Sequence, residues 1–141
     1  MVIGIVVAVV VIIALFAVSV YNRLIKGANS CEEAFSTMDV YLKKRYDLIP
    51  NLVNTVKGYA KHEAETLEAV VELRNTAAKA SADEDVMKAN ADLSKGISKL
   101  FALAEAYPDL KANTNFIALQ EQLEAVEKDI ANARKYYNGC V

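Results

Sequence analysis

The hydrophobic pattern divides the chain into two unequal parts. From Val2 to Val20 almost every residue is Val, Ile, Ala, Leu or Phe, and the first 20 residues carry no charged side chain. A helix rises about 1.5 Å per residue, so a segment of this length covers a hydrocarbon core of about 30 Å. The pattern predicts an N-terminal transmembrane helix with its juxtamembrane segment in residues 1–27 and a helical bundle domain in residues 28–141.

The segment that follows the apolar stretch favours continued helix. Ser30 and Glu33 have the spacing of a capping box, which would begin a new helix, but only Gly27 opposes a helix that runs straight through. We expect a continuous helix from the bilayer to about Tyr46.

Asp47 and Pro50 predict the next boundary. Asp47 can cap a new helix, and Pro50 then falls in its first turn, where a missing amide donor matters little. We expect a turn or sharp kink here, followed by a helix through Ala77 that fades between Ala80 and Asp83.

Two later segments show the strongest periodicity in the chain, with apolar residues alternately three and four positions apart. The first seam comprises Val86, Ala89, Leu93, Ile97, Leu100, Ala104 and Tyr107 and stops at Pro108, and the second comprises Phe116, Leu119, Leu123, Val126, Ile130, Ala133 and Tyr137. Narrow seams are typical of long helices packed at shallow angles in a bundle or coiled coil. With no alternating strand pattern, the expected fold is all-α, an elongated antiparallel bundle whose seams form the core or an assembly contact.

A secretory signal peptide is the alternative for the apolar stretch, with Ala17-Val18-Ser19 as a cleavage site. The stretch has no preceding basic residue and exceeds the roughly 7–15 apolar residues of a signal peptide, which favours a span. Tyr21 and Arg23 follow immediately and are expected to anchor the helix at the membrane interface. Basic residues occur only after the span, which favours a single-pass protein of the cell membrane with its helical domain in the cytoplasm.

No catalytic or metal-binding motif is complete in the sequence. His62 is followed by Glu63, but a zinc-protease motif needs a second histidine where Thr66 stands. Cys31 and Cys140 lack a neighbour that would orient a base, and reduced thiols are the interpretation we favour. We therefore expect no enzyme, no cofactor or metal, and no small-molecule substrate.

Charge argues against nucleic acid as a partner, because 16 basic residues are balanced by 18 acidic ones. The one basic cluster comprises Lys43, Lys44 and Arg45, with Asp47 beside it. Its ordinary interpretation is a solvated turn; the sharper hypothesis is contact with anionic lipid or a partner. A straight helix of about 25 residues would hold this turn about 35 Å from its own membrane, which favours a membrane protein partner.

Several stretches resemble the LemA family in order and spacing. They are Tyr21-Asn22-Arg23-Leu24, Met38-Asp39-Val40, Leu42-Lys43-Lys44-Arg45, Asp47-Leu48-Ile49-Pro50-Asn51-Leu52-Val53, Val56-Lys57-Gly58-Tyr59, His62-Glu63, Tyr107-Pro108-Asp109-Leu110-Lys111-Ala112-Asn113, Asn115-Phe116, Leu119-Gln120, Ala133-Arg134 and Tyr137-Asn138. The resemblance implies a bacterial protein with one N-terminal membrane helix followed by long antiparallel helices, and no established reaction or cofactor. A magnetosome member of the family is associated with forming an intracellular membrane compartment, which makes membrane organisation an analogy.

The chain differs from the usual pattern of this family in one respect. Family members usually continue the fourth helix beyond the Tyr137-Asn138 pair, whereas this chain ends at Val141. Either the final turns are dispensable or another chain supplies their packing, and the second option favours assembly.

Two functional hypotheses remain. The first is a membrane-anchored, non-enzymatic helical scaffold that forms a homo-oligomer and organises or remodels the lipid bilayer. The second is an accessory or signalling subunit that binds a membrane protein partner through residues 43–50.

Overall fold

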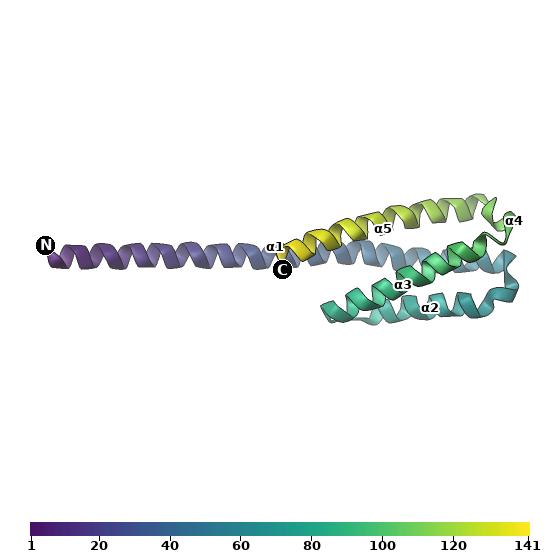
Figure 1. Cartoon of the computed structure of the whole chain (residues 1–141), viewed down its shortest axis with the longest axis horizontal. Coiled ribbons are helices and arrows are strands. Elements are labelled where there is room, and N and C mark those ends of the chain that lie inside the picture. Colours follow the sequence, from purple (N-terminus) through teal and green to yellow (C-terminus); the bar gives the residue numbers. More distant parts are fainter.

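The structure is a computed structural model that describes residues 1–141, and it contains helices and no strand. The elements are α1 (Val2–Tyr59), the 3-10 helix η1 (Lys61–Glu63), α2 (Ala64–Lys79), α3 (Asp83–Ala104), α4 (Pro108–Lys111) and α5 (Thr114–Cys140). Helices α2 and α5 pack along the C-terminal half of α1, while its N-terminal half projects alone (Figure 1). Helix α3 packs along α2 and reaches α1 through its side chains. The all-α expectation is confirmed.

The projecting half of α1 is long and apolar enough to cross a membrane. Its most apolar 18-residue window has a mean hydropathy of 3.2 and no buried residue. Side chains are exposed up to Asn29, and the first fully buried one is Ala34. The predicted domain boundary after residue 27 therefore lies within a part of α1 that packs against no other helix. The helix continues through this point without a break, as expected for a continuous helix as far as Tyr46.

The prediction of a turn at Asp47 and Pro50 is wrong, because α1 continues through Pro50 to Tyr59. Proline has no N–H group, so the carbonyl oxygen of Tyr46 loses its partner within the helix. Arg74 of α2 replaces that donor, with its Nε 3.2 Å from the Tyr46 oxygen. A contact from another helix thus lets α1 pass a residue that would otherwise break it.

The chain reverses only after Tyr59, and the predicted second helix is in fact two pieces, the end of α1 and the separate α2. Ala60 leaves the helical conformation, with φ −124° and ψ 56°, and is buried. The boundary predicted between Ala80 and Asp83 is confirmed, since α2 ends at Lys79 and α3 begins at Asp83.

Helices α3 and α5 also begin and end for local reasons. Three acidic residues, Asp83, Glu84 and Asp85, occupy the first turn of α3, where the helix dipole favours negative charge. Asn113 caps α5 by accepting a hydrogen bond from the Phe116 amide at 2.9 Å. Pro108 separates the two helices by starting the short α4.

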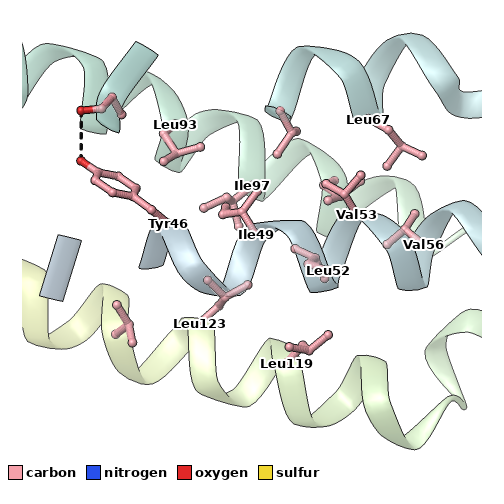
Figure 2. Packing of buried hydrophobic residues seen from close by; sticks show 14 of the residues in the cluster. Tyr46, Ile49, Leu52, Val53, Val56, Leu67, Leu93, Ile97, Leu119 and Leu123 are labelled. Carbon is pink, nitrogen blue, oxygen red and sulfur yellow. Dashed lines mark hydrogen bonds between the residues drawn. The ribbon is translucent and has the colours of Figure 1, made fainter. Parts of the chain in front are cut away.

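One hydrophobic core joins all the long helices. It includes the predicted seam residues Val86, Leu93, Ile97, Leu100, Phe116, Leu123, Val126 and Ile130, each at most 9% exposed. Ile49 and Leu52 of α1 lie between the α3 seam on one side and the α5 seam on the other (Figure 2). Both seams are therefore core within a single chain, which leaves any contact between chains to other surfaces.

Candidate functional site

A buried arginine holds the most unusual position in the bundle. Arg45 projects from α1 and is 1% exposed. Its Nη1 donates to Glu127 of α5 and to Ser94 Oγ of α3, the latter at 2.6 Å. Its Nη2 donates to Asn90 Oδ1 at 2.6 Å and to the Asn90 carbonyl oxygen at 3.1 Å. One guanidinium group therefore ties α1 to both α3 and α5.

Asn90 and Tyr46 complete this polar cluster. Asn90 is buried, and its Nδ2 donates to the Val86 carbonyl oxygen at 2.8 Å. The Tyr46 hydroxyl lies 2.8 Å from Asn90 Oδ1. It also lies 3.3 Å from the Ala77 carbonyl oxygen, and Figure 2 draws this second contact as a dashed line. Burial raises the pKa of Tyr46 and keeps the hydroxyl protonated as a donor.

The cluster acts as a structural tie. A buried charge is tolerated when it is paired and hydrogen-bonded, and the Glu127 carboxylate supplies the pairing. Only the Nε of Arg45 lacks a partner. The arginine side chain is 1% exposed, whereas the Glu127 side chain is 34% exposed. The guanidinium group therefore depends on the carboxylate for its stabilisation, whereas the carboxylate also reaches solvent.

A cavity of about 380 Å³ adjoins the cluster between α1, α3 and α5. It is lined by Met38, Leu42, Arg45, Val86, Met87, Asn90, Ala91, Ser94, Glu127, Ile130, Ala131, Arg134, Lys135 and Asn138. Its charged lining comprises three basic side chains and one carboxylate, with no histidine or cysteine. The cavity offers hydrogen bonds and positive charge beside an apolar wall.

No group of three or more His, Cys, Asp or Glu side chains gathers anywhere in the chain to hold a metal ion.

The four residues of the predicted contact cluster do not all lie on the same face of α1. Lys43, Lys44 and Asp47 are exposed, but Arg45 points into the core, so the expectation that it contributes to a surface contact is wrong. The residues lie on a continuous helix rather than on a turn. Lys43 pairs with Asp39 at 2.7 Å, and this hydrogen bond raises the pKa of the lysine. Contact of the three exposed residues with a partner stays a prediction.

Tyr21 and Arg23 lie on the projecting half of α1, and both side chains are exposed. They directly follow the apolar stretch, where an interfacial anchor would stand. Their contact with lipid stays a prediction.

Sequence reasoning missed Asn90, Ser94 and Glu127 as members of the buried cluster. A signal for the first was available, because Asn90 follows Val86 by four positions and precedes Leu93 by three. It therefore occupies a seam position, and a polar residue in such a position indicates a specific buried contact. Nothing in the local sequence indicates that the contact is Arg45.

The architecture defines a class of protein: an all-helical bundle built on one N-terminal helix that is long and apolar enough to cross a membrane. Residues 34–141 match the family model described as LemA family, and the chain belongs to the LemA family. It is similar to Protein LemA of Metamycoplasma hominis, with 25% identity over 120 residues that cover 83% of this chain and 54% of the relative. The chain thus spans about half the length of this curated relative.

Proposed function

We propose that this protein is a membrane-anchored, non-enzymatic scaffold whose rigid helical rods self-associate and organise the bilayer that carries them. The observation that supports the proposal is the continuity of α1, which passes from the apolar stretch into the bundle core as one helix of 58 residues. No linker separates the anchor from the domain. Any tilt or position imposed on the anchor is therefore transmitted to the bundle.

Because α1 is continuous, every copy holds its bundle at the same distance from the membrane and pointing the same way. At about 1.5 Å per residue, Tyr21 and Ala34 are separated by about 20 Å of helix, and Tyr21 and Tyr59 by about 57 Å. The bundle then extends away from the membrane along the axis of the anchor, with its α4 end outermost. Confinement to a plane with a common orientation raises the effective concentration of neighbouring copies, so weak lateral contacts suffice for assembly.

Contacts between copies must use surfaces other than the two seams. The outer face of α1 offers one such surface, where Val40 is 64% exposed beside Lys43, Lys44 and Asp47. An exposed apolar side chain among charged ones is suited to a reversible contact.

The test is cryo-electron microscopy of the full chain reconstituted into liposomes. We expect an ordered layer of bundles at constant distance from the bilayer. Insertion of Gly-Gly-Ser after Gly27 interrupts α1 outside the core, and should abolish the order while circular dichroism still reports a folded bundle. Gly27→Ala is the matched control, because it keeps the helix intact and Gly27 has open space around it. Dispersed monomers on smooth vesicles would contradict the scaffold.

A second candidate function is that of an accessory subunit that presents the face around Val40 to a membrane protein partner. The exposure of Val40 beside Lys43 and Lys44 favours this face over the rest of the bundle surface. Lys43→Glu with Lys44→Glu should abolish capture of the partner in detergent extracts and leave self-association intact. Loss of self-association in the same variant would assign this face to the scaffold instead.

We also propose that the protein resides in the cell membrane with the bundle in the cytoplasm. The support is the set of basic residues that follows the apolar stretch, beginning with Arg23 and Lys26. In intact cells, an exposed cysteine introduced at Lys44 should resist a membrane-impermeant maleimide and react after lysis, with Cys31 and Cys140 replaced by serine. Labelling in intact cells would reverse the orientation.

A further inference from the structure

The two cysteines of the chain meet at the point where α5 joins α1. They are 109 positions apart in sequence, and the Cys31 thiol donates to the Cys140 carbonyl oxygen, with Sγ and oxygen 2.9 Å apart. Both side chains are partly buried and neither is in a disulfide. The chain has no other cysteine.

The neighbouring turn of the bundle fixes this register. The Phe35 and Tyr137 rings pack edge to face with centroids 5.5 Å apart. Helices α1 and α5 are antiparallel, so one turn back along α1 from Phe35 reaches Cys31, and one turn onward along α5 from Tyr137 reaches Cys140. The Tyr137 hydroxyl also donates to Asp83 Oδ2 at 2.8 Å, which holds this end of α5 toward α3. The two cysteines are therefore neighbours because of packing on both sides.

We propose that Cys31 and Cys140 are a redox-responsive pair: they stay reduced at the ordinary glutathione potential of the cytoplasm and, under oxidising conditions, form an intramolecular disulfide that fastens the end of α5 to α1. The proposal is independent of the scaffold role, since it concerns how one bundle is closed. The bond would lie at the end of the bundle nearest the projecting half of α1, where α5 ends beside α1 (Figure 1).

The oxidant is a disulfide donor, such as an oxidised dithiol protein or oxidised glutathione. The thiolate of one cysteine attacks a donor sulfur, which forms a mixed disulfide and releases one donor thiolate. The second cysteine, after losing its proton, attacks the protein sulfur of that mixed disulfide and releases the other donor thiolate. The protein loses two electrons and two protons, and the donor disulfide becomes two thiols.

The local environment affects the two steps of this exchange differently. Burial, together with the neighbouring Cys140 thiol, raises the pKa of Cys31. Less thiolate is then present at neutral pH, which slows the first step, the attack on the donor disulfide, as well as reaction with other electrophiles. The adjacent partner thiol, once a mixed disulfide has formed, completes the bond without a further encounter.

Closing the bond would join residues that bracket the C-terminal half of α1, η1, α2, α3, α4 and nearly all of α5. A cross-link across so long a segment restricts the unfolded chain strongly. For the full chain in detergent micelles, we expect oxidation to raise the melting temperature on the order of 10 °C, and dithiothreitol to reverse the rise.

The experiment treats the purified full chain with oxidised glutathione, blocks remaining thiols with N-ethylmaleimide, and digests it with trypsin. The expected product is a cross-linked pair of peptides, residues 27–43 with residues 136–141, from a chain that migrates as a monomer without reductant. Cys31→Ser and Cys140→Ser are the matched controls. Each should melt like the reduced parent and show no shift on oxidation.

Three results would overturn the proposal. The first is full alkylation of both cysteines after oxidation, and the second is disulfide formation only between chains. The third is an intramolecular cross-link that leaves the melting temperature unchanged, because the bond would then fasten nothing. None of these results bears on the lateral order of bundles on liposomes, so this proposal and the scaffold role fail separately.

Discussion

The Nε of Arg74 donates a hydrogen bond to the carbonyl oxygen of Tyr46, 3.2 Å away and four residues before Pro50. That carbonyl is the one which an amide at position 50 would have satisfied. Arg74 lies on α2, so the partner comes from a helix that packs against α1 rather than from α1 itself. The unbroken α1 is therefore a property of the folded bundle.

Removal of the Arg74 donor should destabilise the bundle. Arg74→Met leaves the Tyr46 carbonyl without a protein partner, which should lower the free energy of unfolding by about 1–2 kcal/mol. In a Pro50→Ala background the new amide satisfies the same oxygen, and the effect of Arg74→Met should largely disappear. Urea unfolding of the four variants, followed by circular dichroism, measures the coupling.

Lys79→Met serves as the control for this cycle, since Lys79 is an exposed basic residue of α2 with no side-chain hydrogen bond. It should leave stability almost unchanged. An equal effect of Arg74→Met in both backgrounds would show that Arg74 contributes through packing alone.

The Arg45 and Glu127 pair should respond asymmetrically to truncation. Glu127→Ala leaves a buried guanidinium without its counter-charge and should destabilise the bundle by about 3 kcal/mol. Arg45→Met leaves a carboxylate that already reaches solvent, and should have a smaller effect, about 1–2 kcal/mol. Unfolding free energies of both single variants and the double variant test this order, and the reverse order would refute it.

Leu123→Glu should unfold the bundle, because Leu123 is fully buried in the α5 seam. The change removes an apolar contribution of about 1.5–3 kcal/mol and buries an unpaired carboxylate. Ile117→Glu is the matched control on the same helix, since Ile117 is 41% exposed and should tolerate the charge. Circular dichroism and proteolysis of the two variants measure the difference. A folded Leu123→Glu protein would contradict the packing described above.

Stability should fall at alkaline pH, in part through Tyr46. Burial raises the pKa of this hydroxyl in the folded state. The unfolded state therefore loses its proton first as pH rises, and the contribution of Tyr46 is fully present below about pH 10 and is lost above it. Tyr46→Phe should flatten the decline in melting temperature above pH 10, whereas Tyr136→Phe, at an exposed position, should not. An unchanged decline in Tyr46→Phe would argue against this assignment.

The candidate site was only partly accessible from the sequence. The charge of Arg45 was evident, but in a run with Lys43 and Lys44 it reads as solvated surface. The helical period places positions 42, 45 and 49 on one face, and Leu42 and Ile49 on either side of Arg45 were a sign that it faces inward. Its partners Asn90 and Glu127 come from two other helices, which no local pattern connects to it.

The sequence by itself determined the features that depend on local periodicity. The charge-free stretch, the two seams and the boundary near Asp83 each follow from the spacing of side chains along one segment, and helical geometry converts that spacing directly into a face. Only the tertiary structure decided that α1 passes Pro50, that Arg45 is buried and that Cys31 meets Cys140. In each of these cases the deciding partner lies at least 28 positions away in sequence, and its position is set by the packing of the whole bundle.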